Sequence, residues 1–563
     1  MRRLLTILLL LGAFAAPAQA AGPVTLMPGV TYEKTVQFTP HGAVVVHVLK
    51  APRPGDQNGL YQLAPVLARN SVLGVKQRVT QMEKDFSPTA TVAGINGDLF
   101  SAADGHPSGI FMSSGVLAHP PLSARSSIGI DTAGALHVDR VKFFGTWKGT
   151  GQRRPLAGIN QTPAPGQVEL FTAAYGARTP RIANAASVVL QSFPATAPNV
   201  DLTANVITVT VGGGDVVPAD GAVLMATGAS AAKLQAEAPV GTPVTSRLIL
   251  QPAWTGVLAA LGGGPVLVRN SKPVFRSLED FTNDQVGART ARAAVGQLAD
   301  GRIVLVAVDG GRPGYSSGLT SFELAQALVR LGAVTAVGVA SGDSVTAAFD
   351  GRLLDRPSGR AEQPAKEALL VQYAGVYAPE PALPLLTGET GLTAEPLSYK
   401  IVRPSTVTAA LIGPDGAQHP FETGVAHPAG SYSFTAGAFD HEGTWRFDVS
   451  ATDDLGRAST IERTFRVDAT LQALVVPRSA SGAVRVGFTL TRPAQVTLRI
   501  ETAAGVLLRA LPAATLQAGP GSVRWDGRLP GGTPAFAGTY VAHLVVASDV
   551  GTSERLVSFR FRR

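Results

Sequence analysis

Three glycine-containing polar segments hold the residues of this chain best suited to chemistry. Carboxylates can accept protons, arginines bind anions through charge-assisted hydrogen bonds, and backbone N–H groups of glycine-rich loops can cradle a phosphate. Together these groups indicate a ligand-binding or catalytic site. The alternative is that each Gly-Asp pair only forms a turn. The segments are Asn96-Gly97-Asp98, Asp309-Gly310-Gly311-Arg312 and Ala340-Ser341-Gly342-Asp343-Ser344.

Each polar segment directly follows a short apolar run that is typical of a buried strand, at 91–95, 303–308 and 334–339. A helix is predicted between the last two runs, because Thr320 and Glu323 form a capping-box pattern and Gly332 ends the apolar periodicity. Strand, helix and strand at this spacing predict two parallel strands. Ligands gather at the carboxyl ends of such strands, so the Asp309 and Asp343 segments should share one edge of the sheet. An earlier helix is predicted over 75–86.

The polar segments also belong to a longer series of motifs that resembles the phosphodiester glycosidase family. The resemblance covers about residues 90–371, in order and at plausible spacing. It implies hydrolysis of a bond between a sugar and a phosphodiester; one member of the family removes N-acetylglucosamine from a mannose-6-phosphate diester. The motifs that carry it are Ile95-Asn96-Gly97-Asp98-Leu99-Phe100, Gly105-His106-Pro107-Ser108-Gly109, Leu261-Gly262-Gly263-Gly264-Pro265, Arg292-Ala293-Ala294, Asp309-Gly310-Gly311-Arg312-Pro313-Gly314-Tyr315-Ser316 and Arg356-Pro357-Ser358.

Two stretches depart from the family pattern, and one of them is the family's Arg-Thr-Ala motif, which here reads Arg292-Ala293-Ala294. Where the family reads Asn-Leu-Asp-Gly-Gly-Gly-Ser-Ser-Thr, this chain has Gly338 in place of the asparagine and Ala340 in place of the aspartate. Asp343 replaces a glycine three residues later, and is a candidate to supply the missing carboxylate. Enzymatic activity therefore stays open: the chain is either a glycosidase acting on sugar-1-phosphodiesters or a lapsed relative.

The reaction that the resemblance implies needs anion recognition and a carboxylate more than it needs a strong acid. Its leaving group is a phosphate monoester, which is far less basic than an alkoxide. The candidate catalytic residues are Asp98, Asp309 and Asp343. The candidate substrate-binding residues are Asn96, Arg292, Arg312, Gly263, Gly310 and Ser344. An ion pair within the fold is the alternative role for each arginine.

No cofactor or metal site is predicted. The nine histidines show no metal-ligand spacing, and His106 is the one worth testing because it lies beside the first motif. The Gly212-Gly213-Gly214 and Gly262-Gly263-Gly264 runs lack the ending of a nucleotide-binding loop, so we interpret them as turns. Asp453-Asp454 could contribute to a calcium site, but we interpret this pair as a solvent-exposed turn.

The N-terminal residues predict export. Arg2 and Arg3 precede an apolar run over 4–16, and Ala18-Gln19-Ala20 supplies a cleavage site after Ala20. The run is shorter than the roughly 20 residues that span a bilayer, and no later stretch would span one. The chain has no cysteine, which excludes disulfides and thiolate metal sites. Its formal net charge of +8 suits anionic envelope polymers, and no cluster of basic residues with aromatics indicates nucleic acid.

The chain divides into segments that differ in composition and predicted secondary structure. Residues 1–20 are the predicted signal peptide, 21–375 an α+β or α/β catalytic-type domain with a mixed sheet, and 376–384 a linker. Two all-β Ig-like sandwich domains are predicted at 385–468 and 469–563, because a pattern repeats: Arg403-Pro404 returns as Arg492-Pro493, and Asp454-Leu455-Gly456 as Asp549-Val550-Gly551. The second sandwich, with Trp525-Asp526-Gly527, resembles the Ig-like domain of flagellar-hook-capping proteins.

Two hypotheses from different classes follow. The first is an exported hydrolase that cleaves glycosyl-phosphodiester bonds in envelope or extracellular glycans. The second is a catalytically lapsed glycan-binding or structural envelope protein on the same scaffold, which the changes at Gly338 and Ala340 favour. In both, the partner is a phosphate-containing glycan or glycoconjugate, and the sandwich domains attach to an envelope component. The compartment would be the periplasm, the cell surface or the medium.

Overall fold

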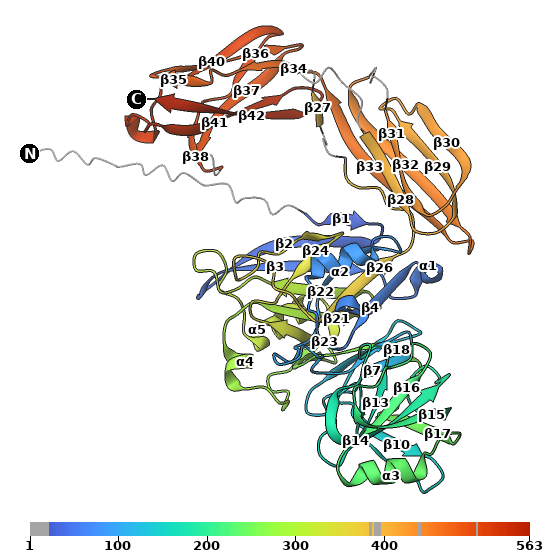
Figure 1. Cartoon of the computed structure of the whole chain (residues 1–563). Coiled ribbons are helices and arrows are strands. Elements are labelled where there is room, and N and C mark those ends of the chain that lie inside the picture. The colour runs from blue at the N-terminus through green and yellow to red at the C-terminus, as the bar shows by residue number, and fades with distance from the viewer. Residues whose placement is uncertain are drawn as a thin grey trace, which may run out of the picture. The chain divides into compact units, whose positions relative to one another are not determined.

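The computed structural model describes residues 22–381, 385–387, 396–436, 439, 441–502 and 505–562. The fold is rich in strands and has several sheets (Figure 1). It forms two compact units: the chain up to residue 87 with residues 92–372, and residues 88–91 with the chain from 373 onward. The predicted signal peptide and residues 382–384 of the predicted linker lie outside the described residues. In the part of the chain that is described, no helix is long and apolar enough to cross a membrane.

An eight-stranded sheet forms the centre of the first unit, and every pair of neighbouring strands in it is antiparallel. The parallel direction predicted for the strands at 303–308 and 334–339 is nonetheless confirmed. The strands at 303–308 and 333–341 do run in the same direction, but the strand starting at Arg292 lies between them and pairs with both. Arg292 is opposite Val308 on one side and Ser341 on the other, so the two polar segments still follow at one edge. In order, the strands are β1 (Val24–Met27), β2 (Val30–Thr39), β3 (Gly42–Ala51), β22 (Ile303–Val308), β21 (Arg292–Leu298), β23 (Ala333–Ser341), β19 (Val266–Arg269) and β20 (Lys272–Pro273).

The helix predicted after residue 320 is confirmed as α5 (Ser321–Arg330). Thr320 accepts a hydrogen bond from the Glu323 N–H, and the Glu323 side chain accepts one from Thr320, which completes the capping box. Gly332 follows the helix with a φ of 92°, a conformation that glycine adopts without strain. Leu324 and Leu328 pack into one core with strands β3, β19, β21, β22 and β23. The helix is thereby fixed on this sheet with its N-terminus near the start of β21.

Three further sheets and four shorter helices complete the first unit. The helix expected over 75–86 begins only at Val79, because the Lys366 ammonium binds the carbonyl oxygens of Leu73 and Val75, and Val75 is 58% exposed. The helices are α1 (Asp56–Gly59), α2 (Val79–Phe86), α3 (Ala229–Glu237) and α4 (Asn283–Gly287). The sheets are β11 (Arg154–Leu156), β10 (Lys142–Lys148), β17 (Pro243–Gln251), β15 (Asp201–Gly213), β14 (Arg181–Gln191), β16 (Ala222–Ala226), β13 (Val168–Thr172) and β12 (Gly158–Ile159); β7 (Val116–His119), β6 (Phe111–Ser113), β18 (Val257–Gly262), β8 (Ser127–Asp131) and β9 (Leu136–Asp139); and β25 (Arg352–Leu353), β24 (Ala347–Phe349), β5 (Thr91–Asn96), β26 (Glu367–Tyr373) and β4 (Tyr61–Leu67).

The second unit contains two repeats whose larger sheets have the same strand order. In each repeat a short early strand, β27 or β35, pairs in parallel with the last strand, and the last strand forms a hairpin that pairs with the strand after the Arg-Pro motif. The smaller sheets differ, with two strands in the first repeat and three in the second. The first repeat contains β27 (Leu385–Thr387), β33 (Ala458–Asp468), β32 (Gly443–Asp453), β29 (Ser405–Ile412), β30 (Gln418–His427), β28 (Pro396–Ile401) and β31 (Gly430–Thr435). The second contains β35 (Ser479–Ser481), β42 (Thr552–Arg562), β41 (Gly538–Ala547), β37 (Ala494–Thr502), β38 (Leu507–Ala510), β39 (Ala514–Leu516), β34 (Leu471–Val475), β36 (Val484–Leu490) and β40 (Gly519–Trp525).

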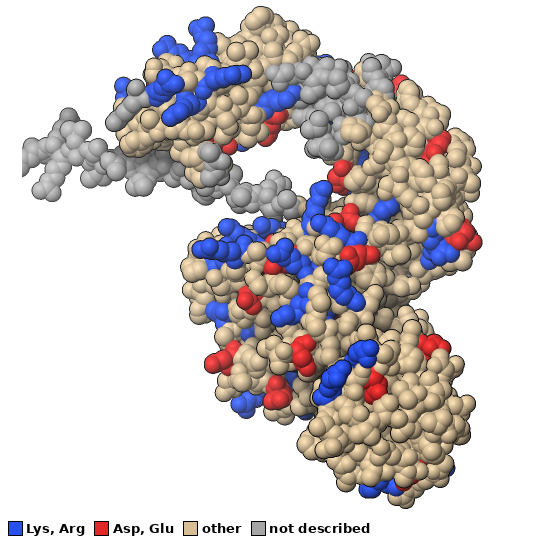
Figure 2. Space-filling view, in the orientation of Figure 1, with Lys and Arg blue, Asp and Glu red and all other residues tan. Residues whose placement is uncertain are grey.

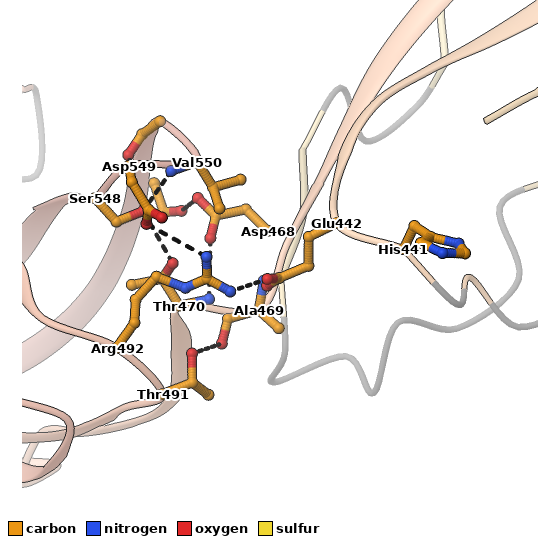
Figure 3. Close-up of polar contacts among 12 residues, drawn as sticks. His441, Glu442, Asp468, Ala469, Thr470, Thr491, Arg492, Ser548, Asp549 and Val550 are labelled. Atoms are coloured by element: carbon orange, nitrogen blue, oxygen red, sulfur yellow. Dashed lines mark hydrogen bonds and ion pairs between the residues drawn. The ribbon is translucent and has the colours of Figure 1, made fainter. Parts of the chain in front are cut away.

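The repeated Arg-Pro and Asp-x-Gly motifs meet as ion pairs. Arg403 binds Asp454 through two hydrogen bonds of 2.6 and 2.8 Å, and the equivalent Arg492 lies 3.3 Å from Asp549. Arg492 also binds Glu442 of the first repeat, as Figure 3 shows. Two hydroxyls, those of Thr470 and Ser548, lie 3.1 Å apart in the same cluster. The second copy of the ion pair thus also joins the two repeats.

Candidate functional site

A cavity of about 240 Å³ opens where the family-like motifs of the first unit meet. Its walls come from the loop after β5, the turn between β18 and β19, α4, the start of β21, the N-terminus of α5 and the end of β23. These segments are far apart in the sequence, and the eight-stranded sheet with α5 brings most of them together. The lining residues are Leu99, Arg125, Gly264, Pro265, Leu267, Phe281, Gln285, Arg292, Ala293, Ser321, Leu324, Gly338, Val339, Ala340 and Ser341.

Arg125 is the cavity's first unsatisfied donor. Its Nη2 donates a 2.6 Å hydrogen bond to Asp98 Oδ1, and its guanidinium lies 4.6 Å from the centre of the Phe281 ring. The side chain is buried, yet its Nε has no hydrogen-bond partner among the described residues. A buried donor without a partner is costly, so Arg125 is prepared to bind an anion in the cavity. Sequence reasoning missed this residue.

Asp98 lies directly behind Arg125, and glycines from two other motifs make room for it. A Cβ at Gly262 would overlap Asp98 Oδ2, and one at Gly109 would come within 3.0 Å of the same atom. Oδ2 is buried and accepts no hydrogen bond from the described residues. Burial raises the pKa of Asp98, while the Arg125 guanidinium acts against that rise. The structure therefore joins the predicted Asp98 to the cavity only through Arg125, while its unpartnered Oδ2 lies between Gly109 and Gly262.

Glu367, at the start of β26, is a second carboxyl beside Asp98. It is completely buried, and neither of its oxygens has a hydrogen-bond partner in the described structure. Burial raises its pKa well above the usual range, and the Asp98 carboxyl raises it further. Burial therefore favours the protonated form of this carboxyl. Glu367 was not singled out in the sequence, where it only precedes an apolar strand.

Ser321 is the second unsatisfied donor of the cavity. It is the first residue of α5, its hydroxyl is buried, and Oγ has no partner within the described ranges. The N-terminus of a ten-residue helix adds partial positive charge at the same wall. Arg125 and Ser321, each with a buried donor that has no partner among the described residues, thus line the cavity beside the α5 N-terminus.

Arg292 lines the cavity, but most of its donors are already used. Its Nε donates to the Leu319 carbonyl at 2.6 Å, and its Nη2 donates to the carbonyls of Gln285 and Ala288 at 3.0 and 2.8 Å. Burial lowers the pKa of Arg292 to about 10, so it stays charged at neutral pH. Arg292 contributes positive charge to the cavity and ties α4 to the start of α5.

Asp309 and Arg312 do not line this cavity. Asp309 Oδ2 lies 3.0 Å from His47 Nε2 and accepts a 2.9 Å hydrogen bond from the Tyr315 hydroxyl, while its Oδ1 accepts one from the Arg356 N–H. Arg312 donates to the carbonyl oxygens of residues 357 and 359. The structure places both residues in contacts that hold loops together.

The remaining predicted residues fix backbone rather than face the cavity. Asn96 Oδ1 accepts a 3.0 Å hydrogen bond from the Thr346 N–H, which ties the end of β5 to the segment after β23. Gly310 packs against the backbone of 290–291, and a Cβ at Gly263 would crowd Ile128. Asp343 is exposed and Ser344 half-buried, and neither is among the lining residues.

His106, the histidine singled out in the sequence, is partly exposed beside the first motif. Its Nδ1 lies 2.5 Å from Asp104 Oδ1, and its ring stacks on His119. Among the described residues, no three His, Asp or Glu side chains are grouped as they would be for a metal ion.

The model of the phosphodiester glycosidase family matches residues 198–372, which include β21, β22, β23, α5 and much of the cavity wall. This part of the chain is therefore similar to the phosphodiester glycosidase domain. A second model, that of the FlgD Ig-like domain, matches residues 475–549 within the second repeat.

Individual relatives are distant from this chain. A stretch of 107 residues is 30% identical to the SPbeta prophage-derived uncharacterized protein YomE of Bacillus subtilis (strain 168), and covers 19% of this chain and 16% of that protein. A hypothetical protein from Synechocystis is 22% identical, with a TM-score of 0.52 over 63% of this chain and 64% of that one; this likeness shows the fold alone. The catalytic domain of zebrafish N-acetylglucosamine-1-phosphodiester alpha-N-acetylglucosaminidase is 13% identical, with coverage of 63% and 85% and a TM-score of 0.33, too low to carry an argument.

The two departures from the phosphodiester glycosidase pattern lie on the cavity wall. Gly338 and Ala340 both line the cavity, at the positions where the family pattern has an amide and a carboxylate. As a result, no carboxylate is among the residues that line it. The nearest free carboxyl oxygen described is the one on Asp98, behind Arg125.

Proposed function

We propose that this protein is an exported hydrolase that cleaves glycosyl-phosphodiester bonds in envelope or extracellular glycans. The observation that carries the proposal is a pair of buried donors without partners in the described structure, Arg125 Nε and Ser321 Oγ, which line one cavity. A phosphodiester is an anion of suitable chemistry for both. The family match of residues 198–372 supports the choice of a sugar on the other side of the phosphate.

In the proposed reaction, a water oxygen forms a bond to sugar C1 while the C1–O bond to phosphate breaks. The phosphate monoester leaves with that bond's electron pair, and Arg125 with the α5 N-terminus stabilises its charge. We assign the proton that the water loses to Asp98, the carboxylate that binds the lining residue Arg125 and keeps one oxygen without a hydrogen-bond partner in the described structure. The raised pKa of Asp98 makes its ionised form a stronger base than an ordinary carboxylate.

A second candidate function is binding of the same diesters without turnover. Ala340 favours it, because this position on the cavity wall has lost the carboxylate of the family pattern. In this reading the protein is a glycan-binding envelope component. We also propose that the first unit is an α/β domain and that both repeats are Ig-like domains. In this proposal the repeats attach the first unit to its target.

Turnover and binding of a panel of methyl sugar-1-phosphodiesters by the chain 21–563 separate the two candidates. Hydrolysis that Asp98→Asn abolishes would support the hydrolase, with the exposed Asp343→Asn as a matched control that keeps full activity. Saturable binding without hydrolysis would support the second candidate, and Ala340→Asp would then be expected to restore turnover. Neither hydrolysis nor binding of any diester would contradict both.

Export has its own test. We propose cleavage after Ala20, so mass spectrometry of the protein recovered outside the cytoplasm should give a mature N-terminus at Ala21. Recovery of the intact chain inside the cell would contradict export and leave the chemistry of the cavity untouched.

A further inference from the structure

The two repeats of the second unit carry opposite charges on larger sheets of the same strand order. Residues 469–563 contain eleven arginines, no lysine and four acidic residues, whereas 385–468 contain six basic and eleven acidic residues. Figure 2 shows Lys and Arg side chains gathered over the part that Figure 1 labels β34 to β42. Because the same order of strands in the larger sheet tolerates both charge signs, that order does not require this excess of arginine.

Two of these arginines face each other across neighbouring strands. Arg485 on β36 lies directly opposite Arg524 on β40, and both side chains are exposed. Like charges in this arrangement destabilise a sheet. Among the residues described, no carboxylate lies within ion-pair distance of either, and Asp526, the nearest in sequence, accepts a hydrogen bond from the Arg528 N–H. The domain's other acidic groups pair elsewhere: Glu501 and Glu554 with His543, and Asp549 with Arg492.

Three more exposed arginines lie on or directly before strands of the other sheet of this repeat. Arg560 and Arg562 on β42 are opposite Ser479 and Ser481 of β35, and only residues 482–484 separate Ser481 from Arg485. Arg478 is exposed directly before β35, and its carbonyl accepts a hydrogen bond from the Arg560 N–H. Arg560 and Arg562 lie on the other sheet of this repeat, and Trp525 of β40 packs against Phe561 of β42, so the outward side chains of these two strands point away from each other. We therefore call only Arg485 and Arg524, which share one outward face, the arginine face.

The side chains beside the arginine pair are small, and none of them is aromatic. The next outward positions along β36 and β40 are Gly487 and Ser522, followed by Thr489 and Pro520. Proteins that bind single-stranded nucleic acid stack bases on aromatic side chains, and these positions offer none. Arginine binds phosphate with two parallel hydrogen bonds, which lysine cannot do. Side chains opposite each other begin about 5 Å apart, so both guanidinium groups can reach one phosphate.

We propose that the arginine face binds a polysaccharide whose repeats are joined by phosphodiesters. Such a chain is uniformly anionic, needs no stacking, and can lie across the small residues beside Arg485 and Arg524. The arginine face is then a second binding site, separate from the cavity of the first unit. It stands on this domain's own surface and does not depend on hydrolysis in the cavity.

Binding of the chain 21–563 to an immobilised bacterial polysaccharide with phosphodiester-linked repeats tests the proposal. Arg485→Gln with Arg524→Gln should weaken binding at least tenfold at low salt, and the corresponding double lysine variant about threefold, because lysine keeps the charge but not the paired hydrogen bonds. The matched control is Arg247→Gln with Arg302→Gln, which removes the same charge from exposed arginines that pair with Asp201 and Asp300. Dextran should not bind.

The thermal midpoint of the double glutamine variant shows whether a loss of binding reflects a loss of folding. If the pair is kept for binding, the double glutamine variant should have an unchanged or higher thermal midpoint, because like-charge repulsion is removed. The proposal is overturned if the variant binds the polysaccharide within twofold of the parent, or if the control loses as much. It is also overturned if single-stranded DNA binds as tightly with the same losses, which would indicate a nucleic-acid partner.

Discussion

Asp98 and Asp309 both follow a buried strand, both are buried, and both belong to the same series of motifs, but their surroundings differ. Asp309 uses its two oxygens on His47, Tyr315 and the Arg356 N–H. Asp98 uses one oxygen on Arg125 and leaves the other without a partner in the described structure. Both oxygens of Asp309 are therefore engaged within the fold, whereas one oxygen of Asp98 is not. The comparison teaches that motif membership alone does not separate a residue that stabilises the fold from one that can react.

The largest expected effect comes from exchanging the two carboxyls for amides. Asp98→Asn should lower kcat for a sugar-1-phosphodiester by about 10³, the size typical of a lost general base. Asp309→Asn should instead lower the free energy of unfolding by about 1–3 kcal/mol, because its buried partners lose an acceptor. Steady-state kinetics and urea unfolding of both variants measure the two effects. Equal losses of kcat in both variants would remove the distinction between the two regions.

The next largest effect concerns the arginine of each region. Arg125→Gln should raise KM by about 10- to 100-fold, as expected for lost hydrogen bonds to a charged group. Arg312→Gln is the matched control: its donors bind carbonyls of residues 357 and 359, so it should affect stability and leave KM unchanged. An unchanged KM in Arg125→Gln would place the phosphate elsewhere.

Each region also contains a buried carboxyl that makes stability depend on pH. Burial raises the pKa of Glu367 well above its usual range and that of Asp355, near Asp309, to about 7. A group with a raised pKa holds more protons when folded, so its contribution is present at low pH and is lost as pH rises from about 4 toward the folded pKa. Glu367→Gln should make the free energy of unfolding fall less steeply with rising pH, by up to about 1.4 kcal/mol per pH unit. Asp355→Asn should have the same effect only below about pH 7. Urea midpoints from pH 4 to 8 give both slopes; an unchanged slope in Glu367→Gln would mean that this carboxyl is ionised in the fold.

The smallest effect sharpens the position of the phosphate. Ser321→Ala should raise KM about two- to tenfold with kcat unchanged, since one neutral hydrogen bond is lost. The exposed Asp343→Asn serves as the control and should change neither constant. A fall in kcat alone for Ser321→Ala would show that its hydroxyl acts on the reaction rather than on binding.

Local patterns predicted the elements around the cavity well. The strand at 303–308 and the helix after Thr320 were visible from apolar periodicity and a capping box, because those signals lie within one element. The strand neighbours were not predictable in this way. The strand from Arg292 enters between β22 and β23 through pairings that no local pattern records, which is why the expected parallel pair is not adjacent.

The same limit explains the candidate site. Asp98 was visible because it follows a strand within a motif, but Arg125 lies in a loop without a pattern and meets Asp98 only in the folded chain. Ser321 looks like an ordinary first residue of a helix, and its unsatisfied hydroxyl appears only once the cavity forms. Asp309 and Arg312 were candidates by residue type, and only their contacts show that they hold loops together.

Hydrolysis of a methyl sugar-1-phosphodiester in ¹⁸O-labelled water tests the central claim most directly. Attack at C1 leaves the released methyl phosphate without ¹⁸O, as mass spectrometry of that product would show. The account predicts unlabelled methyl phosphate from the parent and from Asp309→Asn, and almost none from Asp98→Asn. Label in the phosphate, or release by Asp98→Asn at the parent's rate, would contradict it.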